Sequence, residues 1–457
     1  MAQQLPGYIQ SNVPNPLENR APWYKNTAPT YAGIFLWFVF WNQIATLGLR
    51  DAGLGICMVA LLVSALICHY LFYLVPGLLG MKTGRPLYIV GTSTFGAVGG
   101  FLMPGFLMGL LQFGWLGVNT FFASTFIVEV FSHKVTTFPD FTLAVVCILW
   151  GLGAAFVGLK GIQYVARVAT YLPLIPLAVL FIMLFKTGLA AGGYQPVVDN
   201  PAAAHAKAWL ATISYVVGFF ATAGAAGVDF GLNSRNARDV KRGGLVGIAL
   251  AIVVSAGIPL LVVAGAHSMR IPGVTSFAFT DVMNVVLGSQ LGGFFMLALT
   301  IASFPPACFS SFIAANSFKT TLPKVNPFVS VGLGAIFSIV IAVFGWAGNL
   351  GAMFGLIGAS FGPICGAMVA DYFMSKMSWP GPRADFNIPG WIAWLAGFVV
   401  GILPNEALTR WGVTSTGQFS FLEPAPVIAF VVGGVIYFIL AKLGLQSRSI
   451  PLGQTKE

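Results

Sequence analysis

Residues 243–266 have the sequence GGLVGIALAIVVSAGIPLLVVAGA, and none of these 24 side chains carries a charge. A helix of about 20 apolar residues is long enough to cross the hydrocarbon core of a bilayer. The whole chain of 457 residues has the same character, because only 8% of it is charged, 57% is hydrophobic and the mean hydropathy is +0.86. Soluble domains are about 25% charged. The composition therefore excludes a soluble enzyme, a nucleic-acid-binding protein and a disordered chain, and it predicts an all-α polytopic membrane protein.

Apolar stretches of this length recur along the chain and predict twelve transmembrane helices. Their approximate bounds are 31–49, 54–79, 101–128, 140–158, 162–185, 207–228, 243–266, 287–315, 327–346, 349–373, 390–405 and 426–445. The segment 1–29 is polar, rich in Pro and Asn, and shows no signal peptide. We expect it to form a cytoplasmic tail, and we expect a second such tail at 446–457.

The cations between the spans predict the orientation. With both termini in the cytoplasm, 17 of the 23 Lys and Arg residues fall on the cytoplasmic side and six on the outer side. Cytoplasmic loops of membrane proteins carry such an excess. The split predicts a multi-pass protein of the cell inner (plasma) membrane, embedded in the lipid bilayer with both ends inside. It also accounts for the net charge of +10 without a nucleic-acid partner, because the cations lie between spans and not on one basic face.

A few polar side chains inside the spans are candidates for a binding site. Gln112 and Trp115 are three residues apart in the third span and therefore share a helix face. They form either helix–helix contacts or the edge of a ligand site, where an amide lies beside the flat face of an indole. Asn42 in the first span has no charged partner nearby in sequence, so it bonds across helices or faces water, and it is a further candidate for the site.

Two spans contain residues that disturb helices. The sixth has glycines at 218, 224 and 227, which indicate either close packing or a broken helix with Phe219 and Phe220 at the break. In the eighth, Ser303 is followed by the pair Pro305-Pro306. We expect this pair to interrupt the helix, either as a simple kink or as a second irregular segment near the site.

Motifs for catalysis are absent from the sequence. It has no Gly-x-Ser-x-Gly, no His-Glu-x-x-His, no P-loop and no clustered His and Asp ligands. The five cysteines lie in apolar stretches and form no Cys-x-x-Cys pair. We therefore expect no enzyme activity, no metal and no cofactor. Transport would be secondary, by a facilitator or an ion-coupled carrier.

Four stretches of the chain resemble the nucleobase–cation symporter family, in particular its cytosine permease and purine–cytosine permease branches. Gln112-Phe-Gly-Trp115-Leu-Gly117 is similar to the Gln-x-Gly-Trp-x-Gly of cytosine permeases. The other three stretches are 83–96, then 216–224 continuing to Asp229-Phe230 and Arg235-Asn236-Ala237, and 363–372. Each motif alone is weak, but together they follow the family's order and spacing over roughly residues 30–375.

The resemblance implies the leucine-transporter-like fold of two inverted five-helix repeats, here 30–187 and 206–373, followed by two further helices at 390–445. In such a fold the first and sixth helices are broken near the middle of the membrane. The resemblance also implies roles for side chains. Gln112 would hydrogen-bond the edge of a planar base, Trp115 would stack on one face of it, and Phe219 or Phe220 would stack on the other.

The resemblance also implies a cation site between the first and eighth helices. The carbonyl oxygens of Gly33 and Leu36 and the hydroxyl of Ser303 would bind the ion. Family members with a sodium site place two adjacent hydroxyl residues in the eighth helix, whereas this chain has Ser303-Phe304. A hard cation needs several oxygen ligands, and Phe304 supplies none. The coupling ion is therefore Na⁺ or H⁺.

We expect a secondary transporter, functioning as a monomer, that imports a neutral, planar nucleobase-like heterocycle of the cytosine or purine class. The shortage of charge in the spans favours a neutral ligand. Two alternatives remain open. The first is a carrier of the same fold for another small heterocycle such as hydroxymethylpyrimidine, allantoin or a hydantoin. The second is an amino-acid carrier of the same architecture.

Overall fold

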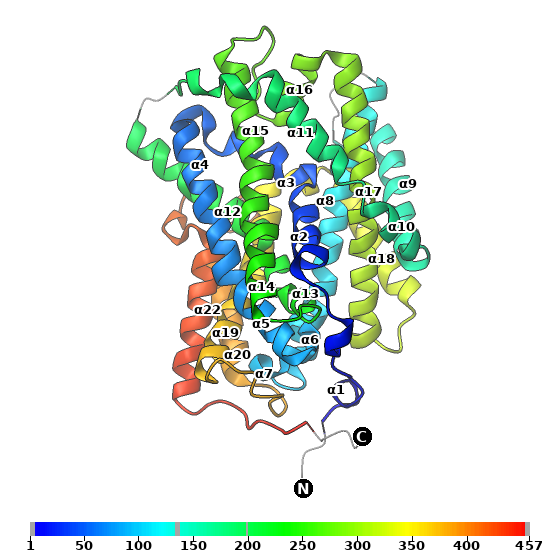
Figure 1. The fold of residues 1–457 in the computed structure, drawn as a ribbon, viewed down its shortest axis with the longest axis vertical. Coiled ribbons are helices and arrows are strands. Elements are labelled where there is room, and N and C mark those ends of the chain that lie inside the picture. Colours follow the sequence, from blue (N-terminus) through cyan, green and yellow to red (C-terminus); the bar gives the residue numbers. More distant parts are fainter. Residues whose placement is uncertain (1–4, 133–137, 198–199, 453–457) are drawn as a thin grey trace.

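The computed structural model describes residues 5–132, 138–197 and 200–452, and these residues form a helical bundle (Figure 1). The residues 1–4 and 453–457 of the predicted tails lie outside this part of the chain. Eight helical segments are long and apolar enough to cross a membrane. They are Leu49–Thr83 (α4 and α5), Phe101–Ser132 (ending in α8), Phe141–Lys160 (α9), Pro201–Ala225 (α12), Ala237–Ser268 (α14 and α15), Ser289–Thr321 (α17), Leu350–Met374 (α19) and Ala425–Lys442 (α22).

Three shorter apolar helices lie at other predicted spans, namely Leu174–Lys186 (α11), Pro327–Val343 (α18) and Ile388–Ile402 (α20). Together with the two short helices of the first span, Thr27–Phe35 and Phe38–Asn42, a helical segment occurs at every predicted span, and the prediction of an all-helical protein with several apolar spans is confirmed. Short helices lie before and between them: Gly7–Gln10 (α1), Leu87–Val90 (α6), Thr92–Phe95 (α7), Gly227–Gly231 (α13), Phe279–Leu287 (α16) and Glu406–Arg410 (α21). The segment Leu49–Thr83 consists of α4 (Leu49–Ile67) and α5 (Leu74–Thr83). The segment Ala237–Ser268 consists of α14 (Ala237–Gly244) and α15 (Ala251–Ser268).

The first span is broken, as the resemblance implies. Helix α2 covers Thr27–Phe35 and α3 covers Phe38–Asn42. Between them, Trp37 has an extended backbone with φ −65° and ψ 122°. Unwound backbone inside a membrane protein is tolerated where it lines a cavity or is buried in protein. The break therefore marks this level of the bundle as a candidate site.

The expected break at Gly218–Phe220 is wrong, because α12 runs without interruption to Ala225 and the chain turns only at Ala226. Close packing explains the glycine. A β-carbon at Gly218 would lie 2.6 Å from the carbonyl oxygen of Phe354 on α19, too close for any side chain. The interruption of the sixth span therefore falls at Ala226, between Gly224 and Gly227, and separates α12 from α13.

The expected interruption at Pro305-Pro306 is also wrong, because α17 remains helical from Ser289 to Thr321. Hydrogen bonds of side chains stabilise the backbone beside the prolines. Asn119 Nδ2 on α8 donates to the carbonyl oxygen of Ser303 at 2.8 Å, and the Ser303 hydroxyl donates to Thr300 O at 2.7 Å. The two prolines leave the carbonyl oxygens of Ile301 and Ala302 without their usual helical N–H donors, a loss that membrane helices commonly tolerate where neighbouring helices pack against them.

The fifth span is divided, although the sequence predicts one helix over 162–185. Helix α10 covers Ile162–Ala169, and α11 begins at Leu174 after a turn that contains Pro173. Helix α10 packs on α9 and α17, whereas α11 packs on α15 as well as α17. The two halves of this span therefore have different neighbours.

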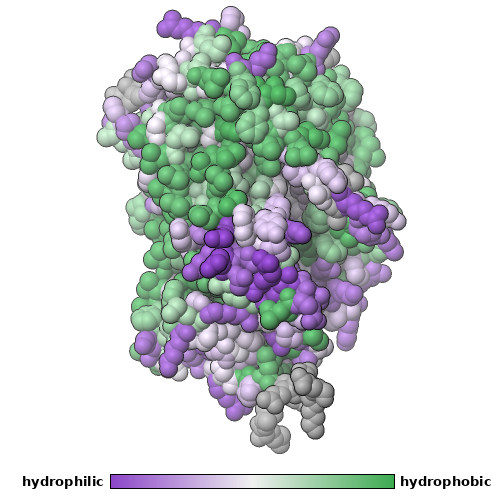
Figure 2. All heavy atoms as spheres, in the orientation of Figure 1, coloured by the Kyte–Doolittle hydropathy of each residue, from purple (hydrophilic) through white to green (hydrophobic). Residues whose placement is uncertain are grey.

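Burial separates central from peripheral helices. In α12 and in α19, 72% of the residues in the most apolar stretch are buried inside the protein. In α9 the corresponding share is 33%. Large apolar side chains are exposed on α9, α18, α20 and α22, among them Leu149, Phe156, Leu333, Leu395 and Val435. Hydrophobic residues cover much of the face shown in Figure 2, and hydrophilic residues gather over the region of α13 and α14. The peripheral helices thus present a lipid-facing surface around a core built on α12 and α19.

The first and last described segments of the chain lie at the same end of the molecule (Figure 1). Tyr8 and Ile9 of α1 pack in one cluster with Ile89, Ala97 and Leu452. The two ends of a chain meet on one side of a membrane only if it crosses an even number of times. This arrangement agrees with the even number of spans predicted from the cations.

We expect Gly366→Ala to destabilise the protein by about 1–3 kcal/mol, the usual cost of overpacking. Helices α19 and α22 are in close contact here, and a β-carbon at Gly366 would collide with the carbonyl oxygen of Phe430. Gly153→Ala on α9 is the matched control, because nothing lies within 4 Å of its β-carbon position. Thermal unfolding of the purified variants in detergent measures both. Equal melting temperatures for the two variants would contradict the close helix contact.

Candidate substrate site

The aromatic cluster, which consists of Trp37, Trp115, Phe219 and Phe354, lies beside the break in the first span. Its members come from four segments: the α2–α3 link, α8, α12 and α19. The Trp115 ring lies 5.2 Å from Phe219, 5.6 Å from Phe354 and 5.9 Å from Trp37, measured between ring centroids. The Trp115–Phe219 contact is nearly perpendicular at 80°, while Trp115 and Phe354 are tilted by 38°. Such rings offer flat apolar surfaces from several directions.

Of the two phenylalanines that the sequence offered for stacking, the structure brings only Phe219 to Trp115. Phe220 is fully buried and stacks on Phe35 of α2, with ring centroids 5.7 Å apart and an interplanar angle of 21°. It also contacts Tyr31. Consecutive residues on a helix point about 100° apart, so only one of the pair can face α8. Phe220 therefore belongs to the packing between α2 and α12.

Sequence reasoning missed two members of the cluster. Trp37 is the extended residue at the helix break, and a search for aromatic residues close to Gly33 and Leu36 could have found it. Phe354 had no such signal, because it is one of 40 phenylalanines and lies outside the motifs. It reaches the cluster because α19 packs directly on α12.

Two polar groups at the cluster keep hydrogen-bonding capacity. The indole N–H of Trp37 is buried and, within the described residues, has no hydrogen-bond partner. Leaving a buried donor unpaired costs about 1–3 kcal/mol. The side chain of Gln112, which shares a face of α8 with Trp115, is 7% exposed, and its Nε2 lies 3.7 Å from the sulfur of Met108. Since a thioether is a weak acceptor, this amide is still able to recognise a ligand.

The structure does not place Asn42 with Gln112 and Trp115. Its side-chain oxygen accepts hydrogen bonds from the backbone N–H of Thr280 at 2.9 Å and from the Thr280 hydroxyl at 3.0 Å. The adjacent Trp41 packs edge to face on Phe279, with ring centroids 4.9 Å apart. These contacts connect α3 to α16. The carbonyl group of Asn42, buried at 3% exposure, is therefore already used within the protein.

Two of the positions considered for a cation make contacts within the protein. The carbonyl oxygen of Leu36 accepts a hydrogen bond from Trp41 Nε1 at 3.1 Å. Phe304, which stands where a second hydroxyl would be needed, packs edge to face on Trp150. Of the three predicted ligands, Leu36 O is the one that accepts a side-chain hydrogen bond. Gly33 O and the Ser303 hydroxyl oxygen accept none from a side chain in the described residues. In the described part of the chain, no group of three or more His, Cys, Asp or Glu side chains could hold a metal.

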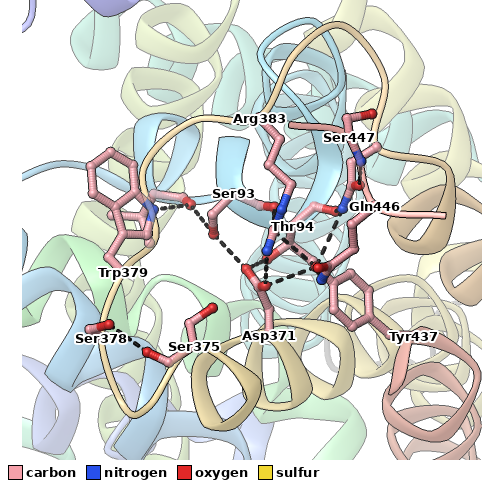
Figure 3. Close-up of polar contacts among 12 residues, drawn as sticks. Ser93, Thr94, Asp371, Ser375, Ser378, Trp379, Arg383, Tyr437, Gln446 and Ser447 are labelled. Carbon is pink, nitrogen blue, oxygen red and sulfur yellow. Dashed lines mark hydrogen bonds and ion pairs between the residues drawn. The ribbon is translucent and has the colours of Figure 1, made fainter. Parts of the chain in front are cut away.

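A buried ion pair lies at the other end of α19 (Figure 3). Asp371 Oδ1 is 2.8 Å from Arg383 Nη2, and the two side chains are only 2% and 5% exposed. Tyr437 of α22 donates to Asp371 Oδ1 at 2.9 Å, and Ser93 of α7 donates to Oδ2 at 2.8 Å. Arg383 also donates to the backbone oxygen of Ser93 and to the Tyr437 hydroxyl. We call these four residues the Asp371 network.

The Asp371 network is remote from the aromatic cluster. Asp371 and Phe354 are 17 residues apart on one helix, which at 1.5 Å per residue separates them by about 25 Å. Its donors and acceptors satisfy one another, as a buried ion pair requires. The network therefore connects α7, α19 and α22 and takes no part in a site at the cluster.

Asp229 of α13 lies just beyond the sixth span and connects two segments. Its Oδ1 accepts the backbone N–H of Leu87, the first residue of α6, at 2.9 Å. Burial raises the pKa of Asp229 from 3.8 to about 6. Tyr31 and Tyr88 are the other titratable groups nearby. A raised carboxyl pKa means that the folded protein holds this proton more tightly than the unfolded chain does.

We expect Asp229→Asn to raise the stability at pH 7 relative to the wild type, by roughly 1–3 kcal/mol. Burial disfavours the charged form of Asp229. The contribution of this carboxyl group to the stability of the wild type therefore grows as the pH falls through 6 toward 4, and it is lost as the pH rises through 6. Asparagine keeps an acceptor for Leu87 N–H without the charge. Melting temperatures at pH 5 and pH 7 test this, because the gain should be clearly larger at pH 7. An equal gain at both values would show that the carboxyl does not titrate there.

Comparison with known proteins identifies the family of this chain. A family model described as a permease for cytosine/purines, uracil, thiamine, allantoin matches residues 13–378. The chain belongs to this family, which confirms the resemblance seen in the sequence. No curated protein matches the chain by sequence.

Solved structures show the fold. The inward-facing conformation of Mhp1 is similar over 98% of this chain and 97% of its own, with 18% identity and a TM-score of 0.66. Mhp1 in a closed conformation with bromovinylhydantoin bound, a nucleobase-cation-symport-1 family transporter, has 16% identity, 95% coverage of each chain and a TM-score of 0.63. A substrate-bound Na⁺-coupled sialic acid symporter has 13% identity, covers 95% of this chain and 92% of its own, and has a TM-score of 0.57. The chain thus has the transporter fold of Mhp1.

Proposed function

We propose that the chain is a secondary transporter that imports a planar, neutral nucleobase-like heterocycle across the plasma membrane by alternating access. The unpaired indole N–H of Trp37 within the aromatic cluster is the observation that carries this proposal. A buried donor next to three further rings fits a ligand that is flat and bears a hydrogen-bond acceptor at its edge. The family to which the chain belongs is described as a permease for cytosine/purines, uracil, thiamine and allantoin, and cytosine, purines and uracil have this chemistry.

The proposed roles follow from the contacts. Trp115 and Phe219 would provide apolar faces for the ring, and Trp37 would donate to an acceptor on its edge. Gln112 would supply both a donor and an acceptor, so it would discriminate between bases by leaving a buried group unpaired when the wrong one binds. Stacking on aromatic rings contributes on the order of 1–3 kcal/mol whichever base is bound.

The proposed architecture is that of two inverted repeats, 30–187 and 206–373, with helices eleven and twelve in 390–445. The interruptions at Leu36–Trp37 and at Ala226 support it, because they fall in the first and sixth spans, which are equivalent in such repeats. Both chain ends would lie in the cytoplasm. The heterocycle itself is not specified by the cluster, and hydroxymethylpyrimidine, allantoin, hydantoin and an amino acid remain candidates for the uptake assay.

The experiment is uptake of labelled cytosine, uracil, adenine, hypoxanthine, hydroxymethylpyrimidine, allantoin, a hydantoin and leucine into proteoliposomes. We expect saturable uptake of at least one planar heterocycle and none of leucine. Liposomes with the Gln112→Ala protein are the matched control, since this variant should lose most of the uptake while remaining folded. Uptake of leucine alone, or equal uptake by wild type and Gln112→Ala, would contradict the proposal.

We further expect uptake to be unchanged within twofold when Na⁺ is replaced by K⁺ on both sides, and to increase when the outside is made acidic. The reason is the poor oxygen ligation between α2 and α17, where Phe304 stands in place of a hydroxyl residue. The same proteoliposomes measure this with imposed Na⁺ or pH gradients. Uptake that depends on a Na⁺ gradient would show that the remaining oxygens suffice for sodium.

A further inference from the structure

Four exposed cations form one surface on α14 and the segment before α2. We define the basic surface as Lys25, Arg238, Lys241 and Arg242, all of which are exposed. On α14, Arg238, Lys241 and Arg242 are three and four residues apart and so share one side of the helix. The opposite side, with Val240, Gly243 and Gly244, is buried. Hydrophilic residues gather over α13 and α14 in Figure 2.

Lys25 joins this surface because its short helix, Trp23–Lys25, lies against α14. The backbone N–H of Trp23 is 3.4 Å from Asp239 Oδ1, and a β-carbon at Gly243 would lie 3.3 Å from Trp23 Cβ. Tyr24 is 58% exposed and makes an edge-to-face contact with Trp23. Aromatic residues of this kind are enriched at the level of lipid headgroups.

The cations of the basic surface are not neutralised within the protein. Asp239 is the acid on α14, and it is engaged by Arg235, whose Nε lies 2.9 Å from its Oδ2. Among the described residues, none of the four cations of the basic surface forms an ion pair. Four uncompensated positive charges close together attract an anion.

The position of α14 selects the kind of anion. It forms the first two turns of the continuous helix Ala237–Ser268, whose remaining turns are apolar. The cations therefore lie where a membrane-crossing helix enters the bilayer. Clusters of Lys and Arg immediately beside such a helix bind anionic lipid headgroups.

We propose that the basic surface binds the phosphate group of an anionic phospholipid in the leaflet next to the chain termini. The headgroup lies across Arg238, Lys241 and Arg242, with Lys25 beside it and the acyl chains along the apolar turns that follow α14. A lipid held here also steadies the start of α2, because the Trp23–Lys25 helix immediately precedes it. This site is separate from the aromatic cluster and does not depend on the transported substrate.

The test compares the wild type with R238Q/K241Q/R242Q in a neutral detergent. Lipid binding is measured by the rise in melting temperature and by native mass spectrometry on addition of dioleoylphosphatidylglycerol, dioleoylphosphatidylcholine or soluble glycerol phosphate. We expect the wild type to bind phosphatidylglycerol preferentially and the triple variant to bind it on the order of 100-fold more weakly, at about 1 kcal/mol for each cation. Raising the salt from 0.1 to 0.5 M should weaken binding by the wild type.

The matched control is R167Q/K319Q/K324Q, which removes the same charge from exposed cations outside the basic surface. This control should bind phosphatidylglycerol as the wild type does. An equal loss of phosphatidylglycerol binding in both triple variants would show that only the net charge of the protein matters, and it would overturn the proposed site. Equal stabilisation by phosphatidylcholine, or by glycerol phosphate without acyl chains, would overturn the assignment to an anionic lipid. Binding of phosphatidylglycerol to the wild type that does not weaken at 0.5 M salt would also overturn the assignment to an anionic lipid.

Discussion

Trp115→Ala is expected to weaken binding of the transported heterocycle on the order of 10- to 100-fold and to reduce uptake to background. The Trp115 ring contacts all three other members of the aromatic cluster, as the ring of Phe219 also does. Losing it removes the stacking surface, which contributes about 1–3 kcal/mol, and leaves Trp37 and Phe219 without their common neighbour. Equilibrium binding of the best-transported base from the uptake panel, measured on purified protein, gives the magnitude.

Two variants separate loss of binding from loss of folding. Trp115→Phe keeps an aromatic ring and should retain binding within about tenfold, since every base can stack on a phenyl face. Trp346→Ala removes an indole that is 57% exposed and stacks on Phe344, outside the cluster, and it should bind like the wild type. Wild-type affinity in a well-folded Trp115→Ala protein would show that the substrate site lies elsewhere.

Arg383→Ala is expected to lower the free energy of unfolding by about 3–5 kcal/mol, which is enough to prevent purification of much of the protein. The substitution leaves the Asp371 carboxylate charged and buried without its cation. It also removes the donors to Ser93 O and to the Tyr437 hydroxyl, and leaves only the hydrogen bonds of Asp371 with Ser93 and Tyr437 to connect α7, α19 and α22. Yield of monodisperse protein and thermal unfolding in detergent report the effect.

The controls distinguish an unpaired charge from the mere loss of an arginine. Arg410→Ala on α21 removes an exposed arginine and should change stability by less than 0.5 kcal/mol. The double variant D371N/R383Q removes both charges and should recover a substantial part of the stability lost in Arg383→Ala, because no isolated charge remains buried. A double variant that is no more stable than the single one would show that the hydrogen bonds, and not the charge, hold these helices together.

The sequence predicted the helical bundle because its signals are local. Runs without charge require a bilayer, and the helical segments occur where those runs lie. Glycine and proline were misleading for the opposite reason, since their effect depends on distant neighbours. Gly218 permits the approach of Phe354 O from α19, and the carbonyl oxygen of Ser303 beside the prolines accepts a hydrogen bond from Asn119 on α8. Neither neighbour can be found from the span in which the glycine or proline lies.

The candidate site was predicted in part. A spacing of three residues put Gln112 and Trp115 on one face, and the motif suggested which phenylalanines to consider, but only the rotation of α12 shows that Phe219 and not Phe220 turns toward Trp115. Trp37 depends on the exact residue at which α2 ends. Asn42 looked free in sequence because its partner Thr280 is 238 residues away. A transport defect in an Asn42 variant could therefore arise from the contact between α3 and α16 without any loss of a substrate contact.

The arrangement of α19 has a mechanical consequence. One end of this helix is fixed by the Asp371 network, and Phe354 lies about 25 Å away toward the other end. Pro363 lies between them, and its ring is packed against Gly397 and Gly433, so it is poorly placed to act as a free joint. Any tilt of a straight α19 about this fixed end would be carried along the helix to Phe354. A tilt of only about 5° would carry Phe354 through about 2 Å, which is enough to take its ring out of contact with Trp115.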